Sequence, residues 1–446
     1  MGWKTSNYTH AIGLESGEGV LYNGRSGALV KLSPGAFERA RSLFETAPRG
    51  TPLPAEAEAE SLFPHLVAGE FVIDEGFDEL AFLEERYHSS RAESQFLITI
   101  LPTFGCNLGC DYCFVGKKVG MMSRERQDQV IEEVARHLEG HTVPSMMVDW
   151  FGGEPLLALP VIEYLSRAFL GLCEQHGIPY GSQVITNGTV ITEEAIRVLE
   201  SSGVERLQIT LDGQGEMHDR RRPYKAGSHS SYEDTLDGIA KAVGRFLIRL
   251  RVNVDRENLH EVWSLVDLFE ERGWLGEDTR FFPYLARISP FTEACSAVSE
   301  QVCSMEEFQE VQLRWMKRLH EAGVPVSYQG LYQFPQPKLY NCGAVGNNGF
   351  IFNPNGEIHK CGLAVDDSSE AVGHLGEGID TEGANSRKWR EYTPFHNEVC
   401  RGCEYLPSCL GGCPRNQMES REVQKKENCT YYQQHENEIL ATHLTL

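Results

Sequence analysis

The stretch FLITILPTFGCNLGCDYCFVGKK, residues 96–118, joins an apolar, strand-like run to cysteines at 106, 110 and 113. Thiolates are soft metal ligands, and clustered cysteines in a chain without a secretory signal more often bind metal than form disulfides. Four thiolates would complete a zinc site or a cubane iron–sulfur cluster, and two would make a redox pair. Three thiolates leave one coordination position open, so the spacing raises the question of what fills it.

Outward from this stretch, strand-like runs alternate with helical patterns. The strand-like runs cover 96–103, 146–153, 182–188, 206–213, 247–255 and 280–288, and the helical patterns cover 123–140, 160–177, 192–203, 232–246, 257–273 and 305–323. Strands that alternate with helices in this way predict right-handed βαβ units and a parallel sheet. We therefore predict an α/β fold with a partial, TIM-like (β/α)6 barrel over residues 93–330.

Polar motifs follow four successive predicted strands, where the working groups of a parallel barrel lie. The cysteines follow the first strand, Gly152-Gly153-Glu154-Pro155 ends the second, Thr186-Asn187-Gly188 the third, and Leu211-Asp212-Gly213 the fourth. Paired glycines let the backbone approach a ligand closely. Each motif alone is a weak signal, and Gly-Gly-Glu-Pro by itself is compatible with a simple turn. Their recurrence at successive strand ends predicts one shared site.

The CxxxCxxC pattern at 106–113, with Tyr112 before its last cysteine, and the Gly152–Pro155 element resemble the radical S-adenosylmethionine (SAM) superfamily. The resemblance implies a [4Fe–4S] cluster on Cys106, Cys110 and Cys113, with its open iron chelated by SAM. One electron would then cleave the sulfonium bond and release a 5′-deoxyadenosyl radical, which abstracts a hydrogen from the substrate. A zinc knuckle is the alternative, but it needs a fourth local ligand, which the sequence does not offer.

The same resemblance implies which residues contact SAM. Carried over residue by residue, they are Tyr112, Gly152, Gly153, Glu154, Asn187, Asp212, Arg222 and Asn253. Tyr112 would lie near the adenine through its backbone, the Gly152–Pro155 backbone near the methionine amino group, and Asn187 and Asp212 near the ribose or methionine. For Arg222 and Asn253, loop capping or salt bridging is the competing interpretation.

Seven further cysteines occur between 342 and 429: Cys342, Cys361, Cys400, Cys403, Cys409, Cys413 and Cys429. Their spacing resembles the SPASM extension of radical SAM maturases, which carries two auxiliary [4Fe–4S] clusters. The resemblance assigns Cys400, Cys403, Cys409 and Cys429 to an outer cluster and Cys342, Cys361 and Cys413 to an inner one. A zinc ribbon would explain Cys400 and Cys403 but not the remaining five. The complete protein would thus hold three [4Fe–4S] clusters.

The inner set lacks an obvious fourth ligand. Either Cys295 or Cys303 supplies it, or the site stays open for a cysteine of the substrate; spare thiols in a connecting segment are the simpler reading of both residues. Cys173 shares an apolar helix face with Ile162, Leu165 and Phe169, so we predict that it belongs to the core.

Residues 1–92 contain short strand-like pieces, helical segments and no cysteine. They are predicted to form a small α+β domain that resembles the leader-peptide recognition element of many peptide maturases; a structural extension of the barrel is the alternative. After Pro337, glycine-rich and cysteine-bearing segments replace the helical periodicity, up to a polar helical pattern at 431–443. We therefore predict three domains, at 1–92, 93–330 and 331–446.

The net charge of −23 argues against a nucleic-acid partner, which favours a basic surface. The N-terminus has no signal-like apolar segment, and no apolar run reaches the length of a membrane span. We therefore expect a cytoplasmic protein that has no membrane partner.

Together these features predict a radical SAM/SPASM maturase that installs a cross-link in a ribosomally made peptide, with a thioether ahead of a carbon–carbon link. Its expected partners are a precursor peptide with a leader and a low-potential electron donor such as flavodoxin or ferredoxin. A sulfatase-maturase-type formylglycine-generating enzyme is the alternative, but such enzymes carry an aspartate after the cysteine where this chain has Gly362. A non-catalytic electron carrier would leave Gly152–Pro155 without a purpose. The sequence does not identify a catalytic base.

Overall fold

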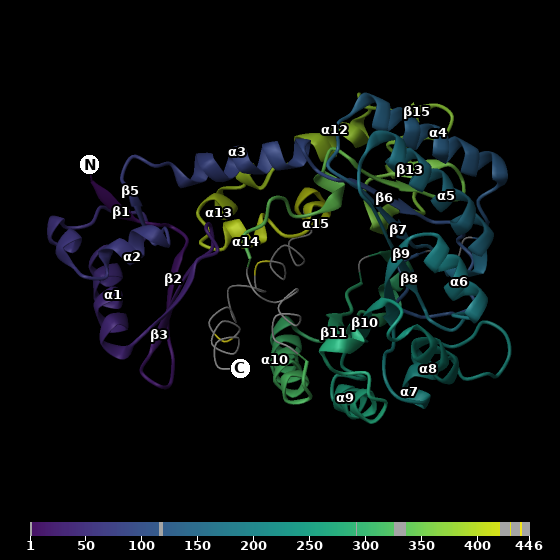
Figure 1. Cartoon of the computed structure of the whole chain (residues 1–446), viewed down its shortest axis with the longest axis horizontal. Helices are drawn as coiled ribbons and strands as arrows, with labels where there is room; N and C mark the ends of the chain where they lie inside the picture. The colour runs from purple at the N-terminus through teal and green to yellow at the C-terminus, as the bar shows by residue number, and fades with distance from the viewer. Residues whose placement is uncertain are drawn as a thin grey trace. The chain divides into compact units, whose positions relative to one another are not determined.

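The computed structural model describes residues 2–115, 119–290, 292–324, 336–419, 429 and 438. The chain divides into two compact units. One, here called the terminal unit, comprises Met1–Ala92, Gly330–Cys342 and Tyr392–Leu446, and the other, here called the sheet unit, comprises Glu93–Gln329 and Gly343–Glu391. Figure 1 gives the element labels used below.

The sheet unit is built on parallel strands that neighbour one another in chain order. These are β6 (Phe96–Ile100), β7 (Met146–Trp150), β8 (Tyr180–Thr186), β9 (Val204–Thr210), β10 (Leu247–Val254) and β11 (Phe281–Arg287). Each strand predicted from the sequence is present, shortened at its carboxyl end where the polar motifs begin. The α/β fold with a parallel sheet is confirmed.

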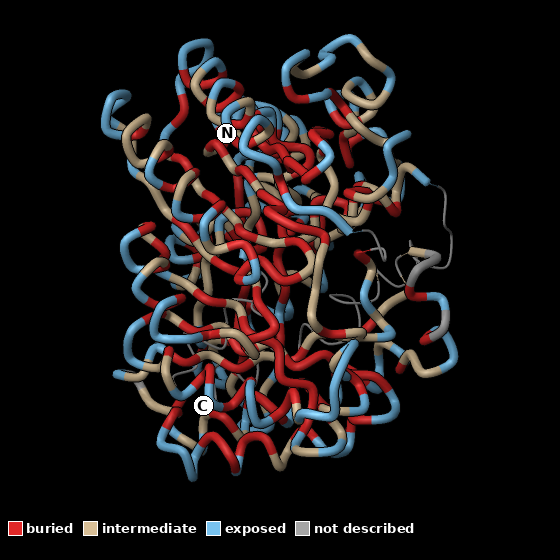
Figure 2. The backbone as a smooth tube through the Cα atoms, turned by 90° about the vertical axis from the view of Figure 1, so that its right-hand side faces the viewer, coloured by how far each residue is buried: buried red, intermediate tan, exposed pale blue. Residues whose placement is uncertain are grey.

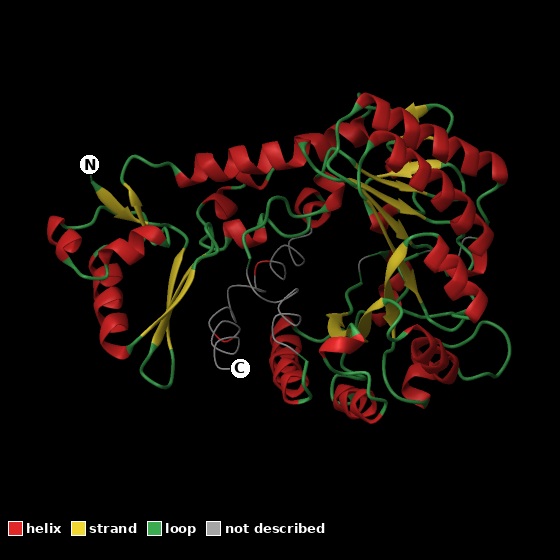
Figure 3. Cartoon of the chain, viewed as in Figure 1, coloured by secondary structure: helices red, strands yellow, loops and turns green. Residues whose placement is uncertain are grey.

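Helices connect these strands and lie on the outer side of the sheet (Figures 1 and 3). They are α4 (Arg124–Gly140), α5 (Leu159–His176), α6 (Glu193–Ser201), α7 (Glu216–Arg221), α8 (Ser231–Ala242), α9 (Val262–Glu271) and α10 (Met305–Glu321). Side-chain oxygens of Ser123, Thr192, Ser230 and Ser304 accept hydrogen bonds from backbone amides in the first turns of α4, α6, α8 and α10. These caps explain why each helix begins where it does.

The core of the sheet unit lies between the strands and the helices, and Figure 2 shows buried positions running along the strands. The α5 side chains Ile162, Leu165 and Phe169 are fully buried there, and Cys173 is 2% exposed. The prediction that Cys173 belongs to the core is therefore confirmed. Contrary to the expectation from the sequence, one segment among the described residues, Pro155–His176, has the length and composition of a membrane span, and 44% of its apolar window is buried inside the protein.

Four more strands extend the sheet beyond β6: β12 (Gly349–Phe352), β13 (Glu357–His359), β14 (Gly373–His374) and β15 (Gly378–Ile379). Strand β12 runs parallel to β6, and the last three pair antiparallel. Residues 343–391, which end in α12 (Ala384–Glu391), therefore pack with the parallel sheet. This grouping differs from the predicted domain boundary at 330/331, because the pairing of β12 with β6 is long-range and has no local sequence signal.

The terminal unit contains the first 92 residues. Strand β1 (Trp3–Thr5) pairs with β5 (Val72–Asp74), and β2 (Thr9–Gly13), β3 (Gly19–Asn23) and β4 (Leu29–Leu32) form an antiparallel sheet. Helices α1 (Pro34–Thr46), α2 (Phe63–Ala68) and α3 (Glu79–Ala92) accompany them. Buried Leu21, Phe37, Leu66 and Phe71 form a shared core. The predicted strands and helices of this small α+β region are present.

The C-terminal part of the terminal unit is built from short helices: α13 (Glu398–Arg401), α14 (Leu406–Cys409) and α15 (Pro414–Met418). Helix α3 contacts this part, since Arg91 Nη1 donates to Tyr392 O (2.9 Å) and the Tyr87 ring meets the Phe395 ring. Asn341 Nδ2 donates to the carbonyls of Leu410 (2.7 Å) and Gly412 (2.8 Å). The helix predicted at 431–443 lies, apart from residue 438, outside the described residues.

Candidate active site and cysteine clusters

The loop that carries Cys106, Cys110 and Cys113 begins directly after β6. Thr103 Oγ1 donates to Gly120 O (2.8 Å) and accepts from Gly105 N (2.9 Å) at its start. Farther along, Gly109 N donates to Pro223 O (2.8 Å), and Lys225 N donates to Asn107 O (2.9 Å). The segment after α7 thus holds the cysteine loop by backbone hydrogen bonds.

The three thiols of this loop interact electrostatically. Burial raises the pKa of Cys106, Cys110 and Cys113, and the charge of Cys110 contributes to the rise at the other two; the pKa of Cys113 reaches about 11. Leu108 N donates to Cys106 Sγ (3.4 Å). Thiols are the donors that an iron–sulfur cluster takes, so the chemistry of this donor set fits such a cluster. In the part of the chain that the structure describes, no group of three or more His, Cys, Asp or Glu side chains is arranged to hold a metal ion.

The Gly-Gly-Glu-Pro turn packs against the cysteine loop. Gly153 N donates to Thr103 O (3.0 Å), and Glu154 N donates to Gly105 O (2.8 Å). A Cβ on Gly153 would lie 2.2 Å from Gly105 O, and Gly152 has a φ of +130°. Both glycines are therefore required by the close approach of two backbones. The turn and the cysteine loop form one rigid element at the carboxyl ends of β6 and β7.

Glu154 is completely buried and joins the ends of β7 and β8. Its carboxylate accepts hydrogen bonds from Leu156 N (3.0 Å), Thr186 Oγ1 (2.7 Å) and Asn187 N (2.7 Å). Burial raises the pKa of this carboxyl group, and the hydrogen bonds oppose the rise. Asn187 Nδ2 in turn donates to Asn107 Oδ1 (2.8 Å) in the cysteine loop. Glu154 thus positions Asn187.

Tyr112, Asp212, Arg222 and Asn253 come from four separate segments and meet in one network. The Tyr112 hydroxyl donates to Asp212 Oδ2 and accepts from Arg222 Nη1. Asn253 N donates to Asp212 Oδ1 (2.8 Å), and Arg222 Nη1 lies 3.7 Å from Asp212 Oδ2. Burial raises the pKa of Tyr112 well above its ordinary value. Four residues expected near SAM are therefore in mutual contact at the carboxyl ends of β9 and β10.

Sequence reasoning gave no role to the residues behind this network. His218 is fully buried, and its Nδ1 accepts from Asp212 N (3.2 Å). Burial lowers the pKa of His218 to about 3, so this side chain is neutral. Arg221 Nη1 forms hydrogen bonds with both carboxylate oxygens of Asp255 (2.9 and 2.8 Å). The run His218-Asp219-Arg220-Arg221-Arg222 was the available signal, but its contacts depend on the fold.

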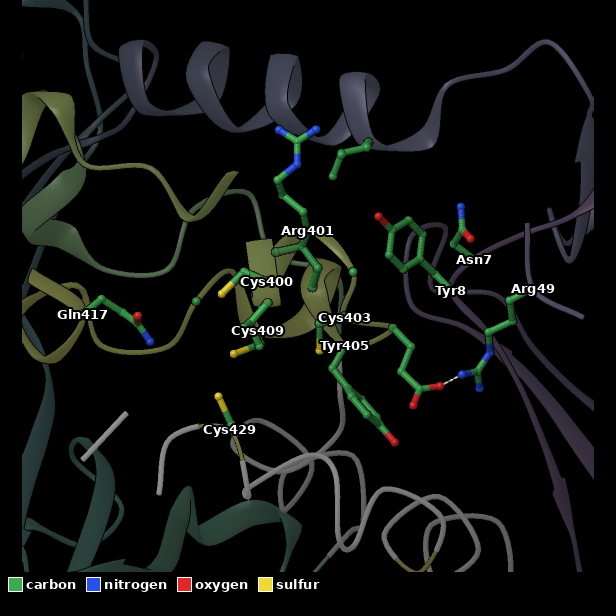
Figure 4. Close-up of a pocket in the computed structure, with 16 residues that line it drawn as sticks. Asn7, Tyr8, Arg49, Cys400, Arg401, Cys403, Tyr405, Cys409, Gln417 and Cys429 are labelled. Carbon is green, nitrogen blue, oxygen red and sulfur yellow. Dashed lines mark ion pairs between the residues drawn. The ribbon is translucent and has the colours of Figure 1, made fainter. Parts of the chain in front are cut away.

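A second group of thiols lies in the terminal unit. Cys400, Cys403, Cys409 and Cys429 line one cavity of about 620 Å³ (Figure 4). Burial, together with the charges of Cys409, Cys429 and Cys403, raises the pKa of Cys400 to about 12. The structure thus brings together the four cysteines assigned to the outer cluster, and their donor set fits such a cluster. Because Cys429 is distant in sequence from the others, this grouping could not follow from local spacing alone.

Residues of the N-terminal segment share this cavity. Asn7, Tyr8 and Arg49 line it together with Glu404 and Tyr405. Arg49 and Glu404 form an ion pair, and the His10 ring lies 5.2 Å from the Tyr405 ring. Burial is the main cause of a raised pKa of Tyr8, to which the Cys403 charge also contributes. The loop between Cys403 and Cys409 is therefore held by the strands and loops of residues 1–92.

The remaining cysteines are divided between the units. Cys342 and Cys413 belong to the terminal unit, and Cys361 belongs to the sheet unit. Cys295 and Cys303 are buried in the sheet unit. The Cys295 thiol donates to Thr292 O (3.2 Å), and burial raises the pKa of Cys303 to about 11. Neither thiol is exposed, so each one already has a packing role in the fold.

Comparison with known proteins identifies the central region of the chain. Residues 100–269 match the radical SAM superfamily, and this region is a radical SAM domain. The chain is 25% identical to the AdoMet-dependent heme synthase of Methanosarcina barkeri, over 69% of this chain and 88% of the relative. It is 24% identical to the PqqA peptide cyclase of Rhizobium meliloti, over 70% of this chain and 80% of the relative.

Solved structures of the same fold cover more of the chain. The structure of anSMEcpe with bound AdoMet and the Cp18Cys peptide has a TM-score of 0.59 and 18% identity, and the likeness covers 79% of this chain and all (100%) of that one. Streptococcus suis SuiB bound to the precursor peptide SuiA has a TM-score of 0.50 and 15% identity, over 94% of this chain and 97% of that one. These likenesses extend the shared fold beyond residues 100–269.

Proposed function

We propose that the chain is a radical SAM/SPASM maturase that abstracts hydrogen from a ribosomally synthesised peptide and installs a cross-link, a thioether ahead of a carbon–carbon link. One observation carries the proposal: three mutually interacting thiols sit on a loop whose backbone is hydrogen-bonded to the Gly152–Glu154 turn. A structural metal site would not require a glycine turn pressed against the ligand loop, whereas paired glycines let the backbone approach a bound cofactor closely.

The protein's own residues would hold SAM and orient it. Cys106, Cys110 and Cys113 are the proposed ligands of the cluster. When bound, a reduced [4Fe–4S] cluster supplies the electron that cleaves the sulfonium bond of SAM to give a 5′-deoxyadenosyl radical. Asp212 and Asn253 offer hydrogen-bonding groups at the strand ends, and Glu154 fixes Asn187 in the same layer. Burial of this network keeps water from the reacting atoms.

The terminal unit supports the peptide part of the proposal. Four thiols line one cavity there, which suits an auxiliary cluster, and Cys342, Cys361 and Cys413 would hold the second one. The antiparallel sheet β2-β3-β4 has β2 and β4 as its edge strands, and a leader segment would add a strand to such an edge. The electron would come from a small donor such as flavodoxin or ferredoxin. Both PqqA cyclase and SuiB are named for action on, or complex with, a peptide.

A sulfatase-maturase-type reaction is the competing function, and the fold it would need is the same. The residue after Cys361 is Gly362, which begins a short 3-10 turn and carries no carboxylate. The nearest carboxylates after it, Asp366 and Asp367, lie on the far side of that turn in sequence. This departure is why a cross-linking reaction is preferred.

The test is anaerobic reconstitution followed by two readouts. Iron per chain should be about twelve for three clusters, and dithionite with SAM should yield 5′-deoxyadenosine. Co-expression with candidate leader-bearing peptides should then give a mass loss of two hydrogens per cross-link. Conversion of a short cysteine-containing sulfatase peptide, with no leader, would instead identify the alternative reaction. Intact SAM under reducing conditions would exclude both enzymes.

A further inference from the structure

The inner face of the parallel sheet, opposite the helices, carries an unusual set of charges. Side chains alternate between the two faces of a strand. Val148, Val184, Leu207, Ile248 and Leu250 are 0% exposed and pack under the helices. The alternate positions therefore point to the inner face, whose upper end adjoins the site at the carboxyl ends of the strands.

Three arginines occupy these alternate positions: Arg206 on β9 and Arg249 and Arg251 on β10. In the strand register Arg206 lies beside Gln183, Arg249 beside Gln208, and Arg251 beside Thr210. On the β8 and β9 side their neighbours are thus amides and a hydroxyl, and on the β11 side Arg249 and Arg251 lie beside Phe282 and Tyr284. Among the described inner-face positions of β7 to β11, Asp149 is the only carboxylate, and it is hydrogen-bonded to Gln183 Nε2 (2.8 Å).

The arginine side chains are half-buried, and Asp149 is the carboxylate that faces them: burial raises the pKa of Asp149, and the charges of Arg206 and Arg249 oppose that rise. Among the described residues neither Arg206 nor Arg251 forms a salt bridge, and Arg206 Nε is buried without a hydrogen-bond partner. Arg206 Nη2 donates to the thioether sulfur of Met147 (3.1 Å), which is a weak acceptor. One carboxylate, Asp149, faces three guanidinium groups. Partly buried cations without enough anionic charge beside them are costly in free energy, so the excess of positive charge points to an anion that binds there.

The arginines also interact with one another and with the candidate active site. Burial lowers the pKa of Arg249, and the charge of Arg206 lowers it further, whereas Tyr284 and the charge of Asp149 oppose the fall, so Arg249 lies close to all three side chains. Arg251 Nε donates to Asn253 Oδ1 (2.7 Å), and Asn253 belongs to the Tyr112–Asp212 network. The three arginines therefore form a row on the inner face. The row begins with Arg251, two residues before Asn253 on β10, and continues through Arg249 and Arg206 toward the amino ends of the strands.

This local charge is opposite in sign to that of the whole chain. The protein has a net charge of −23, whereas Arg206, Arg249 and Arg251 outnumber Asp149 on the inner face. The excess of guanidinium groups makes the electrostatic potential positive at the inner face, although the protein as a whole is acidic. The surrounding low-dielectric protein strengthens that potential by focusing the field. Guanidinium groups also match carboxylates in planar, charge-assisted hydrogen bonds.

We propose that the inner face of the sheet recognises a carboxylate of the peptide substrate, held by Arg206, Arg249 and Arg251 below the Tyr112–Asp212–Asn253 network. The inference rests on the proposed function and adds the substrate class, an acidic peptide segment. The carboxylate comes from an Asp or Glu side chain or from the peptide C-terminus. In either case the arginines fix which residue of the peptide lies nearest the site.

The test uses the reconstituted full-length protein with SAM and four fluorescein-labelled peptides in an Ala–Gly–Cys frame. Two contain a pair of glutamates and two a pair of glutamines, and each occurs as a C-terminal acid and as an amide. Binding is measured by fluorescence anisotropy for wild type and for the variants Arg206→Gln, Arg251→Gln and Arg245→Gln. Arg245 is the matched control, because it pairs with Glu193 and Glu200 at an exposed position.

Among the peptides with an amidated C-terminus, we expect wild type and Arg245→Gln to bind the one with two glutamates at least about tenfold more tightly than the one with two glutamines. Arg206→Gln and Arg251→Gln should reduce that ratio to about two or less. Preference for the C-terminal acids, irrespective of glutamate, would support the same site and identify the terminus as the carboxylate source. Equal binding of all four peptides, or a preference that survives both inner-face substitutions, would overturn the inference.

Two measurements keep this inference separate from the proposed function. Thermal unfolding shows whether Arg206→Gln and Arg251→Gln are folded, and the more stable of the two decides the result if one is not. SAM cleavage is followed in parallel for wild type. Carboxylate-selective binding without 5′-deoxyadenosine would remove the proposed function but leave the anion site, whereas SAM cleavage without selectivity would remove only the inference.

Discussion

The two groups of thiols in this protein are assembled by different means. Cys106, Cys110 and Cys113 lie within one short loop after β6, and that loop is held by backbone hydrogen bonds to a glycine turn. Cys400, Cys403 and Cys409 lie in a segment of short helices, and the fourth thiol of their cavity, Cys429, comes from farther along the chain. The segment is further held by residues of the first 92, including Arg49 through its ion pair with Glu404.

This difference shows how each site tolerates change. Backbone-to-backbone contact at the first group leaves no room for even one methyl group, so its geometry is set by main-chain packing. Side chains and a distant thiol complete the second group, and side-chain contacts at a partly exposed site contribute less free energy each. We therefore expect substitutions at the first group to abolish chemistry and equivalent ones at the second to leave SAM cleavage intact.

Removal of the thiols tests the comparison most directly. Cys106/Cys110/Cys113→Ala should lower the iron content from about twelve to about eight per chain and abolish 5′-deoxyadenosine formation. Cys400/Cys403/Cys409→Ala should lose a similar amount of iron but still cleave SAM. Iron analysis and chromatography of SAM products measure both. An iron content unchanged by the first triple substitution would contradict the assignment of the radical site.

The backbone contact at the first group predicts the next largest effect. Gly153→Ala should slow SAM cleavage by at least ~100-fold, because its Cβ would force the turn away from the cysteine loop. Gly171→Ala is the control: a Cβ there meets nothing within 4 Å, and alanine in a helix should stabilise the fold by ~0.5–1 kcal/mol. SAM turnover and urea unfolding of the two variants give the comparison. Equal turnover would mean that the turn is not pressed against the loop.

Acidification should weaken the support behind the first group. The pKa of His218 is about 3 in the folded protein, against an ordinary value near 6.5 when unfolded. Unfolding therefore takes up a proton between these values, and the stability present above pH 6.5 is lost as the pH falls. From pH 7 to pH 5 this loss amounts to about 2 kcal/mol.

His218→Gln has no such titrating group. Its free energy of unfolding should therefore fall by about 2 kcal/mol less than that of the wild type between pH 7 and pH 5. Urea titrations at pH 7 and pH 5 on both proteins measure the difference. Identical pH dependence for the two proteins would show that His218 is not buried in its neutral form behind Asp212.

The smallest effect is expected at the second group. Glu404→Gln removes the ion pair with Arg49 and should cost about 0.5 kcal/mol, since both side chains are partly exposed. Glu15→Gln, at an exposed position in the same unit, is the matched control and should change stability less. Unfolding at low and high salt distinguishes the two, because only the ion pair is screened. A loss above 2 kcal/mol would mean that this segment is held as rigidly as the first.

Local sequence patterns predicted the regular elements well. Each of the alternating strands and helices from Phe96 to Glu321 occurs as expected, because apolar periodicity and capping residues act within a few positions of the chain. The pairing of β12 with β6, which moves residues 343–391 into the sheet unit, was not predicted. Strand pairing over such a separation depends on which edge is free after the rest of the sheet forms.

The motifs at the strand ends also indicated the thiol loop, the glycine turn and Asp212, and the family resemblance implied Asn253. Neither indicated that the Glu154 carboxylate accepts hydrogen bonds from Leu156, Thr186 and Asn187, because these contacts form only when the ends of β7 and β8 lie side by side. The arginines at 249 and 251 were visible as alternate residues of a strand. Their meaning required knowing which face carried the helices.

What the sequence determined by itself was the chemistry: thiols at cluster spacing, paired glycines, and the order of strands and helices, all encoded within short windows. Only the tertiary structure decided which distant groups meet, namely His218 with Asp212, and Arg206 with Arg249. The reason is physical. Local preferences are set by neighbouring residues, whereas burial, charge proximity and strand-end assembly arise only when the whole sheet has packed.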